Sequence, residues 1–293
     1  MAEPPVLVTG ATGHVGSHLV AALLAQGKPV RAVSRESFSR AGVETVQADV
    51  LDRDSLDAAF DGVGAAYYLV HALASDGGYG EEERTGAQNF AAAAEAAGVG
   101  RIVYLGGIAR GDGLSEHLRT RQEVGEILRA SSVLTIELQT SVVIGEGSAS
   151  FELVRSLVDY LPVLVLPDWI DSYCQPIALA DVVEYLVSSL EVDVPASAIF
   201  EIGGADRITY RQLLDEYGRA TGSKRPTIAV PALPIPFAGW LTSFAPEQVR
   251  VSAKLVDSLR FDSSVEDEAA LQAFEIRPRG VRAAIAEVVA GGA

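Results

Sequence analysis

The chain has 293 residues, 48% of them hydrophobic and 21% charged, with a formal net charge of −16 at pH 7. This composition excludes a disordered chain, and the acidity disfavours nucleic acids and anionic membranes as partners because like charges repel. The single cysteine, Cys174, excludes an intrachain disulfide and suits a reducing compartment. Without a basic and apolar leader or an apolar run of membrane-spanning length, the sequence predicts a cytoplasmic protein. Its expected partner is a small-molecule substrate, and a homodimer is left open.

The first two-thirds of the chain alternates short β-branched runs with longer helical stretches, which is typical of βαβ units and a parallel sheet. Strands are expected at Val6–Val8, Val30–Val33, Glu44–Gln47, Ala66–Val70, Ile102–Leu105 and Leu134–Leu138. The intervening helices are expected at His14–Gln26, Asp54–Phe60, Glu81–Gly98 and, behind an N-cap at Ser115, up to Ala130. Because crossovers between parallel strands share one hand, phosphates and substrates are expected at the carboxyl ends of these strands.

The alternation becomes less regular beyond Gly145. Here we expect helices at Phe151–Tyr160, at Leu179–Leu190, from the Thr209–Gln212 capping box to about Gly222, and from about Gly280 onward, with one strand at Ile199–Ile202. The prolines between Pro226 and Trp240 exclude an inner strand or a continuous helix there. Pro246 suits the first position of a further helix.

The sequence therefore predicts an α/β fold, a Rossmann-type doubly wound parallel sheet with a small C-terminal substrate-side subdomain. Residues 1–203 are expected to form the NAD(P)-binding Rossmann domain, with 145–175 contributing to the substrate pocket. Residues 204–293 are expected to form the mostly helical subdomain.

A glycine-rich segment, Thr9-Gly10-Ala11-Thr12-Gly13-His14-Val15-Gly16, lies between the first expected strand and the first expected helix. In this position Gly10 permits a tight turn, Gly13 lets the backbone approach a pyrophosphate, and Gly16 lets the helix pack close to the sheet. The N–H groups of the helix N-terminus then face the anion. The segment predicts dinucleotide binding, and a loop that has lost this function is the alternative.

Ser34 and Arg35 follow the second expected strand, where an NAD-preferring site carries an acidic residue for the ribose diol. Arg35 can pair with a 2′-phosphate and stack on adenine, so the expected cofactor is NADP(H), with NAD(H) as the alternative. An ordinary surface arginine is the other interpretation of Arg35. Asp49 and Val50, after the third strand, are expected at the adenine edge.

The run Val-Thr-Gly-Ala-Thr-Gly-His-Val-Gly resembles the atypical short-chain dehydrogenase/reductases, with their NmrA-like and isoflavone-reductase-like relatives. Segments 68–71, 101–107, 115–128, 148–151 and 200–204 are similar to a bacterial NAD(P)H-binding branch of that group. The resemblance implies an extended Rossmann sheet with a substrate pocket under the segments after Gly145 and Gly203. The cofactor contacts expected in all are Gly10, Thr12, Gly13, His14, Val15, Gly16, Ser34, Arg35, Asp49, Val50, Leu69, Val70, His71, Gly106 and Arg121.

The resemblance also exposes a departure from the family pattern. Short-chain dehydrogenases usually carry Tyr-x-x-x-Lys on the helix after the fifth strand, whereas this chain has His117-x-x-x-Arg121 there, and Gly106-Gly107 replaces the serine region. Residues four apart share a helix face. His117 can act as a general acid or base near neutral pH, and Arg121 can hold a ribose but carries no proton. We expect both as catalytic residues; helix-surface or nucleotide-contact roles are the alternative.

The side chains expected in the substrate pocket are Tyr79, Gln139, Thr140 and Ser141. The tyrosines at 67, 68, 79 and 104 are backup proton donors, or else residues of the core or the pocket wall. His14 and His18 lack a third ligand at a recognised spacing, so no metal site is expected.

These features predict an NADP(H)-binding oxidoreductase of the atypical short-chain type that reduces a small apolar carbonyl, enone or quinone-like compound. Two alternatives stay open. One is a non-catalytic NADP(H) redox sensor, motivated by the missing Tyr–Lys pair, and the other is an isomerase or lyase that retains its cofactor.

Overall fold

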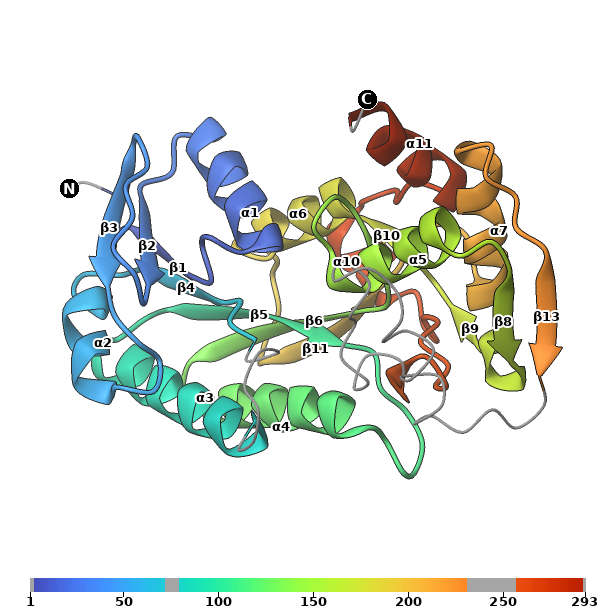
Figure 1. Cartoon of the computed structure of the whole chain (residues 1–293). Coiled ribbons are helices and arrows are strands. Elements are labelled where there is room, and N and C mark those ends of the chain that lie inside the picture. Colours follow the sequence, from blue (N-terminus) through green and yellow to red (C-terminus); the bar gives the residue numbers. More distant parts are fainter. Residues whose placement is uncertain (1–2, 72–78, 231–256, 292–293) are drawn as a thin grey trace.

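The computed structural model describes residues 3–71, 79–230 and 257–291, and its centre is one parallel sheet of seven strands in the order β11-β6-β5-β4-β1-β2-β3 (Figure 1). The strands are β1 (Val6–Thr9), β2 (Val30–Ser34), β3 (Val43–Gln47), β4 (Ala65–Tyr68), β5 (Arg101–Gly107), β6 (Leu134–Thr140) and β11 (Ala198–Ile202). Val6 is in register with both Val30 and Ala65. The first six strands have the order of a dinucleotide-binding Rossmann sheet, in which a crevice opens where the order reverses, between β1 and β4.

Helices cover both faces of the sheet (Figure 1). On one face lie α1 (His14–Ala25) and α6 (Leu179–Ser188), and on the other lie α2 (Arg53–Phe60), α3 (Tyr79–Ala96) and α4 (Glu116–Ala130). Alternate residues of β1 enter different cores, because successive side chains of a strand point to opposite faces. Val6 and Val8 belong to the core under α1 and α6, whereas Leu7 belongs to the core under α2, α3 and α4.

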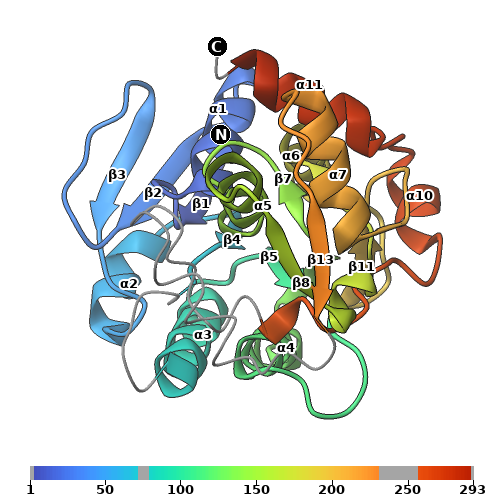
Figure 2. The ribbon, with the colours of Figure 1, turned by 45° about the vertical axis from the view of Figure 1, so that its right-hand side comes forward.

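A third core joins residues 142–178 to the C-terminal part of the chain. Around it lie α5 (Ala149–Tyr160), α7 (Tyr210–Ala220), α11 (Val281–Gly291), β8 (Leu164–Pro167) and β13 (Thr227–Val230), grouped beside the sheet (Figure 2). The smaller elements here are β7 (Val143–Ile144), the 3-10 turn η1 (Asp168–Asp171), β9 (Tyr173–Cys174), β10 (Ile177–Ala178) and β12 (Ile208–Thr209). The short helix α10 (Ala269–Phe274) instead packs on the core under α1 and α6, where Phe274 meets Tyr185 and Phe200. Phe151 of α5 meets Tyr217 of α7 edge to face, with ring centroids 5.7 Å apart. Residues 142–178 thus bury apolar side chains against the C-terminal segment.

The α/β Rossmann prediction is confirmed, and the expected strands and helices are present with ends that shift by a few residues. Two shifts bear on function: β5 continues to Gly107 and β6 to Thr140, because these two residues still pair. The short strands β7, β8, β9, β10 and β12 were not expected. β13 pairs only with β8, in agreement with the exclusion of an inner strand after Pro226. The rest of that proline segment, and Pro246, lie outside the described residues.

The division into two domains at residue 203 stays a prediction.

Cys174 is a buried free thiol, and burial raises the pKa of its thiol. Among the helices of the described residues, none combines the length and the apolar character needed to cross a membrane.

Candidate functional site

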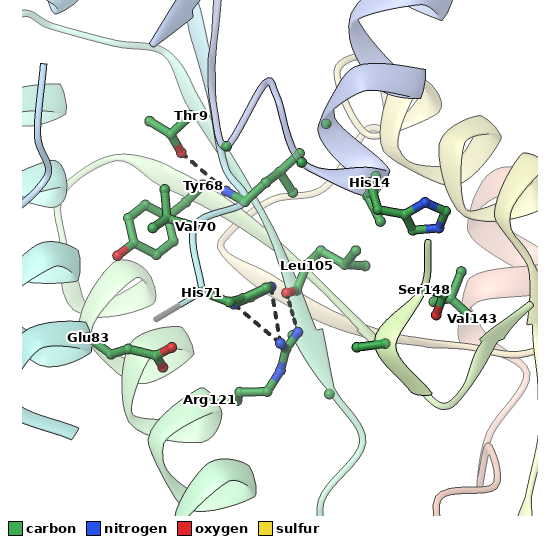
Figure 3. A pocket seen from close by; sticks show the side chains of 18 of the residues that line it. Thr9, His14, Tyr68, Val70, His71, Glu83, Leu105, Arg121, Val143 and Ser148 are labelled. Carbon is green, nitrogen blue, oxygen red and sulfur yellow. Dashed lines mark hydrogen bonds between the residues drawn. The ribbon is translucent and has the colours of Figure 1, made fainter. Parts of the chain in front are cut away.

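A cavity of about 850 Å³ lies along the carboxyl ends of the strands. It is lined by the loop after β1, the ends of β2, β4, β5 and β6, the first turns of α4, and residues from the C-terminal part. Figure 3 shows the part of the cavity around His14, His71 and Arg121. Its volume falls within the range of roughly 300–1,000 Å³ that is usual for small-molecule and cofactor sites. Since the cavity spans the point where the strand order reverses, it occupies the place where Rossmann folds bind their ligands.

Two glycines leave no room for a side chain, Gly10 in the loop between β1 and α1 and Gly16 in the first turn of α1. Gly10 has a φ of +65°, and a Cβ there would lie 2.5 Å from the Leu69 carbonyl oxygen. A Cβ on Gly16 would lie 2.1 Å from the Gly10 carbonyl oxygen. Gly13 caps α1 without a side-chain hydrogen bond, and the first turn of α1 carries no acidic residue. The N–H groups of this turn therefore face the cavity as donors for an anion.

At the end of β2 the cavity wall carries both a cation and an anion, Arg35 and Glu36. Both are exposed, and the Arg35 carbonyl accepts a bond of 2.9 Å from Gln47 Nε2. Glu36 was missed by sequence reasoning, which stopped at the first charged residue after the strand. A ribose diol and a 2′-phosphate could each find a partner here.

Asp49 and Val50 line the neighbouring wall, and hydrogen bonds fix their positions there. The Asp49 carboxylate accepts from Leu51 N at 3.0 Å, and the Val50 carbonyl accepts from Asn89 Nδ2 at 2.9 Å. Every residue expected to contact the cofactor lines this one cavity, although most of them come from different loops of the chain. Their roles toward a nucleotide stay predictions.

Arg121 lies at the centre of the site, where its guanidinium is held by two partners (Figure 3). Its Nη2 donates to the Leu105 carbonyl oxygen at 2.7 Å, and its Nη1 lies 3.1 Å from His71 Nε2 and 3.3 Å from Nδ1. Its Nε is buried and has no hydrogen-bond partner among the described residues. Because a Cβ on Gly107 would lie 3.1 Å from that Nε, the glycine at the end of β5 makes room for the guanidinium.

His71 is a neutral imidazole in this setting. Burial, and then the positive charges of Arg121 and His117, hold the pKa of His71 well below its ordinary value. A neutral ring keeps one unprotonated nitrogen, which accepts from Arg121. His117, in the first turn of α4, is 8% exposed and lines the same cavity. The structure thus brings His117 and Arg121 together on one face of α4, as expected, while their catalytic roles stay predictions.

The backup tyrosines differ in where their hydroxyls point. Tyr67 Oη donates to the Leu186 carbonyl at 2.8 Å, and Tyr104 Oη donates to the Arg121 carbonyl at 3.1 Å. Both hydroxyls are therefore engaged with backbone carbonyls. Tyr68 lines the cavity. Burial raises the pKa of all three hydroxyls far above neutral. Glu83 of α3 is 5% exposed, lines the cavity near Tyr68, and was missed by sequence reasoning (Figure 3).

Of the four side chains expected in the substrate pocket, Thr140 and Ser141 line the cavity and Gln139 does not. Because β6 extends through Thr140, Gln139 and Glu137 share a face of the strand, and Gln139 Nε2 donates to Glu137 Oε1 at 2.7 Å. Gln139 is therefore corrected from a pocket residue to a partner of Glu137. The side chain of Tyr79 lies outside the described part of the structure.

The cavity also has a wall contributed by the C-terminal part, on the side where the resemblance places the substrate pocket, although its individual residues were not identified from the sequence. This wall is formed by Tyr210, Ser258, Leu259 and Ser263.

His14, at the start of α1, has its pKa lowered by burial and then by the charge of His18. Among the described residues, no three His, Cys, Asp or Glu side chains gather as metal ligands.

Comparison with known proteins places the chain in a family. Residues 3–135 match the NmrA-like family. Over 229 residues the chain is 30% identical to a (4-alkanoyl-5-oxo-2,5-dihydrofuran-3-yl)methyl phosphate reductase from Streptomyces griseus, covering 74% of each protein. It is 37% identical over 107 residues to sterol demethylase protein B from Methylococcus capsulatus, so it spans only 33% of the length of that relative.

Among solved structures, MoeE5 in complex with UDP-glucose and NAD superimposes with a TM-score of 0.73 at 20% identity, covering 98% of this chain and 97% of MoeE5. That likeness concerns the fold alone. The family match and the relative that shares 74% of its length carry the assignment further. The chain belongs to the NmrA-like family of atypical short-chain dehydrogenase/reductases, a family of oxidoreductase type built on a nucleotide-binding Rossmann sheet.

Proposed function

We propose that this protein is an NADP(H)-dependent reductase of a small, largely apolar carbonyl, enone or quinone-like compound. The observation that carries the proposal is the cluster of His71, His117 and Arg121 in the cavity that also contains the glycine loop. The reductase name of the Streptomyces griseus relative supports the same class of reaction. A nicotinamide bound in this cavity would supply the hydride.

The chain's own residues divide the remaining work. Arg121 is permanently charged and is held rigid by Leu105 and His71, so it suits hydrogen bonding to a ribose or stabilising a developing oxyanion. It cannot deliver a proton. His71 is kept neutral by its surroundings and is occupied as an acceptor. His117 is then the group in this cluster that can donate a proton to the reduced substrate.

The test follows NADPH absorbance with a panel of aldehydes, ketones, enones and quinones, comparing wild type with His117→Gln and His117→Phe. We expect turnover to fall by about 10²–10⁴-fold, the usual contribution of a general acid, while NADPH affinity holds. Arg119→Gln, on the exposed side of the same helix turn, is the matched control. Tight NADPH binding without turnover of any compound would favour the sensor alternative, and turnover unchanged in both His117 variants would remove the proton-donor role.

The preference for NADP(H) depends on Arg35. We propose that its guanidinium pairs with the 2′-phosphate, a charge-assisted contact that Glu36 cannot make. Arg35→Asp should weaken NADPH binding by about tenfold more than NADH binding, for a contact worth about 1.4 kcal/mol. Arg40→Asp makes the same charge change nearby, but Arg40 donates to the Ser17 carbonyl at 3.0 Å and does not line the cavity. Equal losses of NADPH and NADH affinity in Arg35→Asp would refute the preference.

A further inference from the structure

Three hydroxyl groups form a chain on the wall of the cavity that faces the C-terminal part. Ser141 Oγ lies 2.7 Å from Ser263 Oγ, and Ser263 Oγ lies 3.2 Å from Tyr210 Oη. Ser141 follows β6, Tyr210 begins α7, and Ser263 belongs to the segment after residue 257, so tertiary structure alone brings them together. All three line the cavity. We call these three residues, together with Thr140, the hydroxyl wall.

The hydroxyl wall is held in place by the backbone around it. Ser263 N donates to the Tyr173 carbonyl at 3.0 Å, and Gln175 N donates to Ser141 Oγ at 3.4 Å. Tyr210 and Ser263 are 5% and 8% exposed. Burial raises the pKa of the Tyr210 hydroxyl far above neutral, so this hydroxyl keeps its proton. The wall is therefore a fixed set of hydrogen-bonding groups.

A count of hydrogens shows what the wall lacks. Three hydroxyls carry one hydrogen each, and the two bonds between them use two of these hydrogens, whichever atoms donate. One O–H is left without a partner among the residues that the structure describes, and in every arrangement it belongs to a residue that lines the cavity. Thr140 Oγ1 adds a second unmet group: Thr140 is 8% exposed, and its hydroxyl has no hydrogen-bond partner among the described residues. A buried hydroxyl without a partner is costly, so a ligand oxygen here would be stabilised.

The surroundings of the wall select the kind of oxygen. Several apolar side chains line the same cavity, among them Ile108, Leu118, Val142, Leu153 and Leu259. The groups of the wall itself are all uncharged. An anion would lose its hydration here and gain only neutral donors, whereas a carbonyl oxygen needs no more than one or two such donors.

We propose that the hydroxyl wall binds a neutral oxygen, of the ketone, ester or lactone type, on an otherwise apolar substrate, and that it discriminates against carboxylates and phosphates. This inference deepens the proposed reductase function and rests on it. A leftover O–H at the end of a hydrogen-bonded chain is polarised by its neighbours, which makes it a stronger donor than an isolated hydroxyl.

The experiment uses two pairs of probes that differ mainly in charge, methyl cinnamate with cinnamate and 4-phenyl-2-butanone with 3-phenylpropanoate. Ligand-observed NMR titrations measure their affinities for the whole protein, with and without saturating NADP⁺. We expect the neutral probe of each pair to bind more tightly. Tyr210→Phe, Ser263→Ala and Thr140→Val should each weaken it by about three- to tenfold, as for one lost hydrogen bond. Ser172→Ala removes a hydroxyl of the same region that does not line the cavity and should change nothing.

Charged probes that bind as well as neutral ones overturn the proposal, as do neutral probes that fail to bind wild type or bind every variant equally. The comparison of charged with neutral probes is made on the wild-type protein, so it does not depend on whether any variant folds. NADP⁺ binding and NADPH turnover are measured separately, so loss of the reductase function is distinguishable from loss of the hydroxyl-wall specificity.

Discussion

Gly125 of α4 packs directly on a buried carboxylate. A Cβ at this position would lie 2.4 Å from Glu137 Oε2 and 2.5 Å from Oε1. Both distances are shorter than 3.0 Å, below which Cβ contacts essentially never occur in proteins. Glu137 is 1% exposed, and its carboxylate is held by Arg129 Nε and Gln139 Nε2, each at 2.7 Å. The carboxylate cannot move aside without leaving a buried charge poorly paired. Gly125→Ala is therefore expected to destabilise the protein although alanine favours helices.

The size of the effect follows from opposing contributions. Alanine in a helix interior is favoured over glycine by about 1 kcal/mol. Overpacking a core costs about 1–3 kcal/mol, and separating a buried ion pair can cost about 3–5 kcal/mol. The Arg129 side chain is 28% exposed and keeps some hydration, which places the second cost at or below its lower limit. We expect a net loss of about 2–3 kcal/mol in the free energy of unfolding, equivalent to a Tm lower by about 3–5 °C in a chain of this size.

Thermal and urea unfolding followed by circular dichroism measure this loss. Gly80→Ala on α3 is the matched control, because among the described residues the nearest atom to its Cβ would be Thr120 Oγ1 at 3.7 Å, and it should be neutral or slightly stabilising. In a Glu137→Ala background the carboxylate is gone, so Gly125→Ala should cost nothing there. The same loss in both backgrounds, or none in the wild-type background, would refute the reasoning.

Three further predictions concern the loop, the site and the C-terminal contact. Gly16→Ala forces a Cβ to 2.1 Å from a backbone oxygen and should lower nucleotide affinity by at least about tenfold, measured by calorimetric titration; unchanged affinity contradicts it. The lowered pKa of His71 means that the unfolded chain binds more protons below about pH 6.5, so wild-type stability falls on acidification below that pH, by at most about 1.4 kcal/mol per pH unit from this group. Urea unfolding of His71→Gln should show a shallower fall, and parallel curves would remove this role. Asp181, 2% exposed, accepts from Arg279 N at 2.7 Å, and Asp181→Asn should cost about 1–3 kcal/mol in thermal unfolding, with the exposed Glu184→Gln as control.

Within the site, sequence reasoning was most successful where neighbours in the chain act together. The residues from Gly10 to Gly16 do their work within one turn, so their spacing indicates their geometry. His117 and Arg121 share a helix face for the same local reason. Gln139 was expected after the end of the strand, but β6 continues to Thr140. Because side chains alternate along a strand, Gln139 then lies on the same face as Glu137 and donates to it.

The groups that sequence reasoning missed lie on segments far apart in the chain. Tyr210 looked like part of a helix start, and Ser263 carried no pattern at all, yet Ser263 meets Ser141 across 122 residues of chain and Tyr210 across 53. Their partners are set by how α5, α7 and the last segment pack on the third core.

The sequence by itself determined the parallel sheet, the glycine loop and the cavity's position at the strand ends, because hydrophobic periodicity and glycine stereochemistry act over a few residues. Only the tertiary structure decided that Arg121 is held by His71 and Leu105, that His71 is neutral, and that an uncharged hydroxyl wall closes the cavity. The physical reason is that burial and long-range hydrogen bonds depend on which distant segments pack together, and no local pattern records that choice.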